Sequence, residues 1–313
     1  MYKVFIDGNQ GTTGLRLFDR LSKRDDIELL TISEELRKDK NERKRLINES
    51  DITFLCLPDD ASRESVSLCD NENTVIIDTS TAHRTNPDWA YGFAELSDEH
   101  RVKIASSKRI AVPGCHASGF ISIVYPLVAK GIMPCDYPVV CHSLTGYSGG
   151  GKKMINDYEN EKNSDLFAPR QYGLSQNHKH LKEMKVITGL SDFPLFTPIV
   201  DDYYSGMATT VPLFKKLLND NTGIEHIHSM FTEHYKNSKF IEVLPLHGGE
   251  TPVSMISANE KSGKDSMKIL ISGNEERIFI TSVFDNLGKG ASGAAVQCMN
   301  ISMGIDETTS LDI

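Results

Sequence analysis

KVFIDGNQGTTGLRLFDRL, residues 3–21, is the stretch of sequence that decides the fold. It begins with a short β-rich run and ends with apolar residues at the spacing of an amphipathic helix. Between them stand Gly8, Gly11 and Gly14, a G-x-x-G-x-x-G variant of the G-x-G-x-x-G fingerprint. Glycine lets the backbone turn sharply and approach a pyrophosphate, whose charge the following helix N-terminus stabilises. We predict a dinucleotide-binding loop here; the alternative is a tight strand-to-helix turn without a ligand.

The rest of the chain shows two different patterns of strand-like and helical segments. Apolar strand-like runs at 27–32, 52–57, 74–77 and 108–112 alternate with helical segments, which is typical of a doubly wound parallel sheet covered on both faces. After Cys115 come a buried helix at 117–129 and strand-like runs at 139–144, 240–246, 268–272 and 277–284, which indicate an α+β domain with an antiparallel or mixed sheet. We expect a first domain over 1–114, completed by a C-terminal helix within 287–313, and a second over 115–286.

Composition excludes several classes of protein. The 313 residues carry a net charge of −9, which argues against binding nucleic acid through its phosphates. The longest apolar stretch, 120–129, is far shorter than the roughly 20 residues of a membrane span, so no membrane partner is expected. No export signal is visible, and the six cysteines form no C-x-x-C pair. We therefore expect reduced thiols and a cytoplasmic location.

The choice between NAD and NADP stays open from the residues alone. An acidic residue about 20 positions past the glycines would favour NAD, and Glu34 and Glu35 fall in that window. Ser33, Arg37 and Lys38 lie beside them and suit a 2′-phosphate. Alternatively, 37–45 is simply the solvated face of a helix.

Cys115 is the candidate nucleophile. It follows Pro113-Gly114, which end a strand, and a helix beginning near His116 would place the thiol at a helix N-terminus. The helix dipole there stabilises a thiolate and lowers the pKa of a thiol. A thiolate beside a dinucleotide site predicts covalent attack on an aldehyde or acyl carbon.

A partner for the thiol is expected in the segment 175–183. This segment reads as a helix start capped by Ser175 or Asn177, and His180 and Glu183 share a face, so the carboxylate can orient the imidazole. The His178-Lys-His180 pattern also resembles a metal pair, but no third ligand has a suitable spacing. His226 and His228 are interpreted as exposed or capping histidines.

Anion-binding candidates complete the set. The loop 147–153 contains three consecutive glycines and two lysines, which suits a phosphate or acyl phosphate; a flexible surface turn is the alternative. Arg84 and Arg170 are further candidates, with surface ion pairing as the other interpretation.

Taken together, these motifs resemble those of the N-acetyl-γ-glutamyl-phosphate reductase family. The order is the glycine loop, Pro113-Gly114-Cys115, Ser148-Gly-Gly-Gly-Lys152, His178-Lys-His180 with Glu183, Phe196-Thr-Pro198, and NLGKGASGAAVQCMN at 286–300. The similarity runs from residue 3 to about 304 and is nearest to the type 2 branch. Many relatives have Asn-Pro-Gly-Cys-Tyr where this chain has Val112 and His116.

The resemblance implies a Rossmann domain joined to a domain like that of glyceraldehyde-3-phosphate and semialdehyde dehydrogenases. It also implies NADP(H) as cofactor, an acyl-phosphate substrate with release of inorganic phosphate in arginine biosynthesis, and a homodimer or tetramer. Cys115 would form a thioester, His180 would be the acid/base and Glu183 its orienter. The cofactor-binding candidates are Gly8, Gln10, Gly11, Thr12, Thr13, Gly14, Ser33, Arg37, Lys38, Pro58, Ser80, Ser148, Gly149 and Asn286. The substrate-binding candidates are Arg84, Ser118, Lys152 and Arg170.

Three other functions are compatible with these sequence features. Related enzymes reduce aspartyl phosphate or a carrier-linked aminoadipyl phosphate with the same chemistry. A catalytically silent NADP(H)-sensing protein would keep the fold but would not need the cysteine and histidine. A dehydrogenase that transfers hydride directly would need no covalent step.

Overall fold

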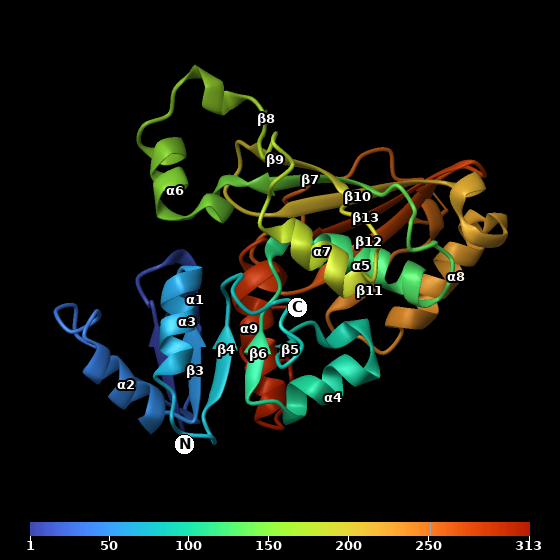
Figure 1. Ribbon diagram of the computed structural model, residues 1–313. Helices are drawn as coiled ribbons and strands as arrows, with labels where there is room; N and C mark the ends of the chain where they lie inside the picture. Colours follow the sequence, from blue (N-terminus) through green and yellow to red (C-terminus); the bar gives the residue numbers. More distant parts are fainter. Residues whose placement is uncertain (251) are drawn as a thin grey trace. The chain divides into compact units, whose positions relative to one another are not determined.

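The computed structural model describes residues 1–250 and 252–313. The chain forms two compact units. The first unit consists of Met1–Gly114 and Ala291–Leu311, and the second of Cys115–Gly290 and Asp312–Ile313. Figure 1 shows the elements of both units.

The first unit is built on a parallel sheet with strand order β2-β1-β3-β4-β6-β5. Its strands are β1 (Tyr2–Asp7), β2 (Ile27–Leu30), β3 (Ile52–Leu55), β4 (Val75–Asp78), β5 (Ala90–Tyr91) and β6 (Arg109–Ala111). Its helices are α1 (Thr12–Leu21), α2 (Lys40–Glu49), α3 (Asp59–Ser67), α4 (Asp98–Ser106) and α9 (Gly293–Ser302), with a 3-10 turn at Ala94–Leu96. The predicted doubly wound parallel sheet is therefore confirmed.

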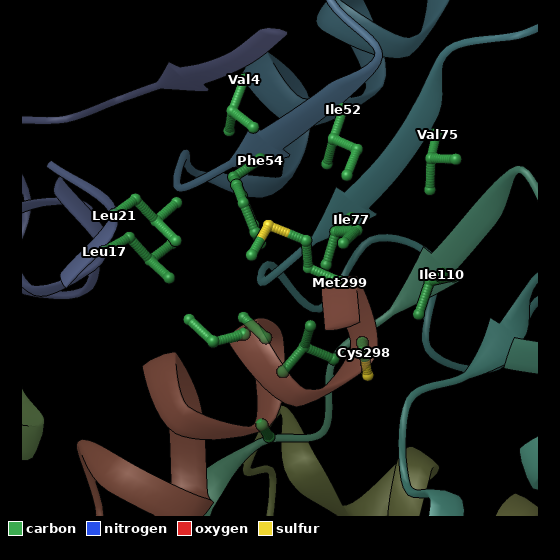
Figure 2. Packing of buried hydrophobic residues seen from close by; sticks show 14 of the residues in the cluster. Val4, Leu17, Leu21, Ile52, Phe54, Val75, Ile77, Ile110, Cys298 and Met299 are labelled. Carbon is green, nitrogen blue, oxygen red and sulfur yellow. The ribbon is translucent and has the colours of Figure 1, made fainter. Parts of the chain in front are cut away.

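Helix α9 supplies the centre of a buried cluster in this unit. Its residues Cys298 and Met299 lie among side chains from the strands, such as Phe54 and Ile77, and from α1 (Figure 2). The small residues Ala294 and Ala295, also buried in the cluster, let this helix approach the sheet closely. The C-terminal part of the chain thus belongs to the core of the glycine-loop unit.

A buried ion pair fixes the end of β1. The Asp7 carboxylate accepts hydrogen bonds from the Arg43 guanidinium at 3.1 Å and from the Ser65 hydroxyl at 2.8 Å. Both charged residues are almost fully buried, and Arg43 also pairs with Glu64 at 2.9 Å. This network ties α2 and α3 to the residue immediately before Gly8, so the glycine loop leaves a rigid strand end.

The second unit contains a mixed sheet with strand order β11-β12-β13-β10-β7-β9-β8, which confirms the predicted α+β domain. Its strands are β7 (Val140–Gly146), β8 (Arg170–Gln171), β9 (Leu195–Asp201), β10 (Met207–Phe214), β11 (Ile241–Val243), β12 (Met267–Gly273) and β13 (Arg277–Phe284). Its helices are α5 (Cys115–Ala129), α6 (Gly151–Glu159), α7 (His180–Thr188) and α8 (Ile224–Tyr235). Short 3-10 turns lie at Tyr147–Gly150, Ser164–Phe167, Lys215–Leu217, Asn219–Asn221 and Leu246–Gly248, and a π-helical turn at Gly288–Ser292 precedes α9.

Helices α5, α7 and α8 lie along one face of this sheet (Figure 1). Alternate residues of the central strands, such as Val211 on β10 and Ile280 on β13, are fully buried. The opposite face carries apolar side chains that remain exposed, among them Phe214 (51%) and Phe279 (53%). Of the helices in the described part of the chain, none has the length and apolar character needed to cross a bilayer.

Candidate active site

The glycine loop shows which of its glycines the fold itself requires. Gly8 has φ +92°, and a Cβ there would collide with the carbonyl of Cys56; a Cβ at Gly14 would collide with the carbonyl of Gly8. Gly11 differs, because its φ of −74° suits any residue and a Cβ would be no closer than 3.7 Å to its surroundings. Gly11 is the exposed N-cap of α1, and the fold itself does not require glycine there. A glycine at this position is explained if a pyrophosphate approaches the backbone closely.

The other cofactor candidates of this unit follow the carboxyl ends of successive parallel strands, where α/β sheets bind their ligands. Gln10 is exposed, and Thr12 and Thr13 are half-buried in the first turn of α1. Ser33, Arg37 and Lys38 follow β2 and are exposed, and Arg37 forms an ion pair with Glu34 at 2.7 Å. Pro58 follows β3 as the N-cap of α3, and Ser80 follows β4. Helix α2 starts only at Lys40, so the prediction of a helix face over 37–45 is wrong for its first residues.

Ser80 and Arg84 are buried in the segment after β4. The Ser80 hydroxyl donates to Asp78 at 2.8 Å, and the same carboxylate lies 2.6 Å from Nδ1 of His83. Arg84 donates from Nε to the carbonyl of Val112 at 2.8 Å and from Nη2 to that of Thr79 at 2.9 Å. At 7% exposure, Arg84 is not the surface ion-pair partner of the alternative interpretation. These contacts fix the chain on the approach to Cys115.

In the second unit, Cys115 is the first residue of α5. The first turn of this helix contains no acidic residue, so no side-chain charge there opposes a thiolate. A Cβ at Gly290 would lie 3.0 Å from the Cβ of Cys115, which means that glycine at this position leaves room beside the thiol. The position of Cys115 thus meets two requirements of a reactive cysteine.

A cluster of aromatic side chains surrounds the next residue, His116. Its ring centroid lies 5.9 Å from those of His178 and His180 and 5.2 Å from that of Phe196. Nδ1 of His116 is 2.7 Å from the Ser143 hydroxyl, and Nε2 is 2.6 Å from the Tyr172 hydroxyl. The fold thereby brings together residues from α5, β7, α7 and the segment after β8.

Two histidines of this cluster are held neutral. Burial, with a smaller contribution from His178, lowers the pKa of His116 to about 3. Burial, with a smaller contribution from Lys179, lowers the pKa of His178 to about 4. Neither imidazole carries a positive charge at neutral pH, so neither can act there as an imidazolium acid.

Helix α7 places His180 and Glu183 one turn apart, and both side chains are buried. The predicted caps Ser175 and Asn177 are wrong, because the helix begins at His180. The Nδ1 atom of His178 accepts the backbone N–H of His180 at 3.2 Å and takes the place of a serine or asparagine cap. The His178-Lys-His180 pattern thus serves to start a helix at the cluster.

The glycine-rich loop is more rigid than a surface turn. The Ser148 side chain is buried and accepts from Nδ2 of Asn286 at 3.0 Å, and Oδ1 of Asn286 accepts from Gly206 N–H at 2.8 Å. Gly149 lies against the same amide, since a Cβ there would be 3.4 Å from Nδ2. Lys152 is exposed in the first turn of α6.

The remaining substrate candidates lie in different settings. Arg170 on β8 donates from Nη2 to the Tyr158 hydroxyl at 3.1 Å, and its guanidinium carbon lies 5.4 Å from the centre of that ring. Ser118 is buried in α5. His226 is exposed on α8, and His228 approaches the carbonyl of Leu244 at 3.0 Å. Within residues 1–250 and 252–313, no group of three or more His, Cys, Asp or Glu has an arrangement that could hold a metal ion.

Sequence reasoning missed Tyr172 and Ser143, and it gave His116 no role. They come from separate elements and follow no spacing rule, so the sequence offered no signal that would bring them together. The one available hint was that His116 stands where many relatives have tyrosine.

Comparisons with known proteins cover most of the chain and agree with one another. The domain family "semialdehyde dehydrogenase, NAD binding domain" matches residues 3–104, and "semialdehyde dehydrogenase, dimerisation domain" matches residues 115–286. The first unit is therefore a nicotinamide-dinucleotide domain, and the second is of a kind that forms oligomers. Solved structures of aspartate semialdehyde dehydrogenases share the fold. That of Vibrio cholerae has a TM-score of 0.71 at 16% identity over 97% of this chain and 98% of that one. That of Francisella tularensis has a TM-score of 0.72 at 14% identity over 96% of this chain and 99% of that one.

Curated relatives are much nearer in sequence. The proteins from Brucella ovis and Brucella canis, each named N-acetyl-gamma-glutamyl-phosphate reductase, are 45% identical over 307 residues, 96% of this chain and 99% of theirs. The match covers nearly the full length of both partners. The chain belongs to the N-acetyl-gamma-glutamyl-phosphate reductase family of oxidoreductases.

Proposed function

We propose that the protein reduces N-acetyl-γ-glutamyl phosphate to N-acetylglutamate 5-semialdehyde and phosphate with NADPH, through a thioester on Cys115, as the third step of arginine biosynthesis. The name of the relatives supplies the substrate. One observation carries the chemistry: Cys115 begins α5 immediately before His116, whose ring lies 5.9 Å from that of His180. Covalent acyl transfer needs a thiol nucleophile and an imidazole in the same site to exchange protons with it.

The steps follow from the chemistry of a thiol. The Cys115 sulfur bonds to the acyl carbon as the C–O bond to phosphate breaks, and phosphate leaves with the bonding electrons. Bound NADPH supplies the hydride that brings the thioester to the aldehyde level. Backbone N–H groups at the start of α5 stabilise the oxyanion, and His180, oriented by Glu183, delivers or accepts the proton. The C–S bond then breaks and the thiolate is regenerated.

NADP(H) is favoured over NAD(H) by the segment after β2. Arg37 and Lys38 are exposed beside Ser33, and the Glu34 carboxylate, which would otherwise suit a ribose hydroxyl, is paired with Arg37 at 2.7 Å. Two cations and a hydroxyl there suit a 2′-phosphate. Pro58 and Ser80, at the ends of neighbouring strands, extend the same cofactor edge. We propose that Ser148, Gly149 and Asn286 also bind the cofactor. Hydrogen bonds within the protein already hold the loop that contains Ser148 and Gly149 in place.

Among the substrate candidates, Lys152 and Arg170 have the cationic groups that suit a phosphate or carboxylate. Ser118 is buried in α5, and Arg84 supports the chain before Cys115 through its carbonyl contacts. We propose Lys152 and Arg170 as the anion-binding residues and keep Ser118 and Arg84 as further substrate candidates.

The variant Gly11→Ala should weaken NADPH binding while it leaves the stability of the protein nearly unchanged. A methyl group at Gly11 meets no protein atom closer than 3.7 Å, so stability should fall by no more than about 1 kcal/mol, the cost of alanine at an N-cap. We expect the Kd for NADPH to rise at least roughly tenfold, equivalent to about 1.4 kcal/mol, because the methyl group occupies the approach of the pyrophosphate. Fluorescence titration with NADPH and thermal unfolding measure the two effects. Gly14→Ala is the matched control and should mainly destabilise the protein; unchanged NADPH affinity in Gly11→Ala would contradict the binding site.

A homo-oligomer is supported by the open face of the second unit's sheet. Leu195, Phe214 and Phe279 are each more than half exposed on that face, in strands that pair side by side. An apolar surface of this kind is characteristic of a protein interface. We propose that a second copy of the chain covers it in a dimer, alone or within a tetramer. A cytoplasmic location agrees with six cysteines that form no disulfide among the described residues.

The test is the reaction run backwards, because the semialdehyde is easier to handle than the acyl phosphate. NADPH formation is followed with N-acetylglutamate semialdehyde and NADP, with and without inorganic phosphate. We expect formation that depends on phosphate. No signal from a protein that binds NADP would contradict the proposed substrate, and the same assay with aspartate semialdehyde would test the related reaction.

A further inference from the structure

The turn that follows β13 reaches the nucleophile at Gly290, a residue to which the proposed mechanism gives no role. A Cβ built on Gly290 would lie 3.0 Å from Cβ and 3.3 Å from Cα of Cys115. Contacts this short force a neighbour to move by a few tenths of an ångström. Since the sulfur is one bond from the Cβ of Cys115, the backbone of Gly290 packs against the base of the nucleophilic side chain.

Asp285 holds this turn in one conformation. Its carboxylate is fully buried, and Oδ1 accepts the backbone N–H groups of Leu287 at 2.6 Å and of Gly288 at 3.1 Å. Oδ2 accepts the Ser205 hydroxyl at 3.1 Å and the backbone N–H of Gly263. One side chain therefore joins the turn to two other segments of the second unit.

Backbone contacts carry this constraint on to Gly290. The Gly290 N–H donates to the carbonyl of Asp285 at 2.9 Å. Gly288, between them, lies so close to Lys264 that a Cβ there would collide with the Lys264 carbonyl. The turn cannot move away from Cys115 without breaking buried hydrogen bonds, and a buried polar group left without its partner is costly.

We propose that Gly290 is a positioning residue for the nucleophile, held in place by the Asp285 carboxylate. Its backbone seats the Cys115 side chain at the start of α5, and its lack of a side chain keeps the approach to the sulfur open. The inference rests on the proposed function in that Cys115 is the nucleophile there. Gly290→Ala adds a methyl group beside the sulfur and keeps the backbone N–H that donates to Asp285.

The test compares alkylation of Cys115 by iodoacetamide and by the bulkier N-phenylmaleimide, in the full chain without substrate or cofactor. The modified peptide is quantified by mass spectrometry so that the other cysteines do not interfere. In Gly290→Ala we expect iodoacetamide to react roughly threefold and N-phenylmaleimide roughly tenfold more slowly, because small misplacements at a reacting atom have effects of this order. A general loosening of the structure has the opposite sign, since it exposes the thiol and speeds both reactions.

Gly92→Ala is the matched control. A Cβ at Gly92 would lie 2.9 Å from the Cys298 sulfur and 3.1 Å from the carbonyl of Ala111, all in the first unit. The crowding equals that at Gly290 but does not involve Cys115, so both alkylation rates should match those of the wild type. Unchanged or faster rates in Gly290→Ala, or the same slowing in Gly92→Ala, would overturn the proposal.

Asp285→Asn tests what holds the turn. Both carboxylate oxygens accept hydrogen bonds, so the NH₂ group of asparagine faces donors in either orientation and the turn is released. We expect the ratio of the iodoacetamide rate to the N-phenylmaleimide rate to fall roughly threefold, because the backbone beside the sulfur opens locally. A ratio equal to that of the wild type would overturn the role of Asp285, and Gly290→Ala decides the proposal alone if Asp285→Asn does not fold.

Turnover supplies an independent measurement. In the phosphate-dependent reverse reaction, kcat of Gly290→Ala should fall roughly tenfold or more, while KM for NADP stays near that of the wild type, as expected of a residue that positions the sulfur. An equal fall of kcat in Gly92→Ala would contradict positioning. The alkylation assay needs no substrate, so failure of the reverse reaction in the wild-type protein would count against the proposed function alone.

Discussion

Cys115→Ser is expected to lose at least roughly 10⁴-fold in kcat for the phosphate-dependent reverse reaction, because removal of a catalytic nucleophile has effects of this order or larger. Serine preserves the shape of the thiol, and the space beside Gly290 that receives it remains. A hydroxyl, however, is not ionised near neutral pH, so the start of α5 no longer presents an anion to the acyl carbon. The measurement is the initial rate of NADPH formation from the semialdehyde, NADP and phosphate.

Two controls make this result specific. NADPH affinity and thermal unfolding of Cys115→Ser should match those of the wild type, since the glycine loop belongs to the first unit. Cys135→Ser should keep full activity, because Cys135 is exposed and its sulfur contacts the Ser191 hydroxyl at 3.3 Å. More than a tenth of the wild-type rate in Cys115→Ser would mean that the reaction does not pass through a thioester on this residue.

The sequence predicts the first unit more completely than the second, because the features that identify the first unit are patterns of neighbouring residues. Strands of the parallel sheet contain short apolar runs, such as 4–6 in β1 and 75–77 in β4, and β1 joins its helix through glycines with a known role. In the second unit, β9 and β10 contain Pro198 and Pro212, residues that ordinarily argue against a strand. Their pairing with β7, β8 and β13 is a property of the assembled sheet and leaves no local pattern.

In the candidate site, too, some residues can be recognised from local sequence patterns and others cannot. Cys115 and His180 can be singled out because a helix start after Pro-Gly and a histidine pair are visible along the chain. The contact of His116 with Tyr172 joins residues 56 positions apart, and that with Ser143 joins residues 27 positions apart. Burial, which holds His116 and His178 neutral, is likewise invisible before the chain is folded. The histidine pair alone could therefore not indicate how differently its members are placed.

His180→Gln is expected to lower kcat roughly 10²- to 10⁴-fold, the usual contribution of a positioned acid/base. Glutamine keeps a polar side chain of similar length on α7 but cannot exchange a proton with the oxyanion or the thiol. Binding of NADP involves the other unit, so KM for NADP should change little while kcat falls. The kcat pH profile of this variant is recorded beside that of the wild type.

His178→Gln distinguishes proton transfer from simple loss of a ring in the cluster. The pKa of His178, lowered to about 4, already keeps it neutral across the working pH range, and its observed contact is to the backbone N–H of His180. Its replacement should therefore cost less than about tenfold in kcat and leave the pH profile in place. Equal losses in the two variants, with both profiles unchanged in shape, would mean that the cluster only supports α7 and that the proton is carried by another group. A change of the pH profile in His180→Gln alone would assign that proton to His180, because His178→Gln removes a ring only 4.7 Å away and so controls for the loss of a ring in the cluster.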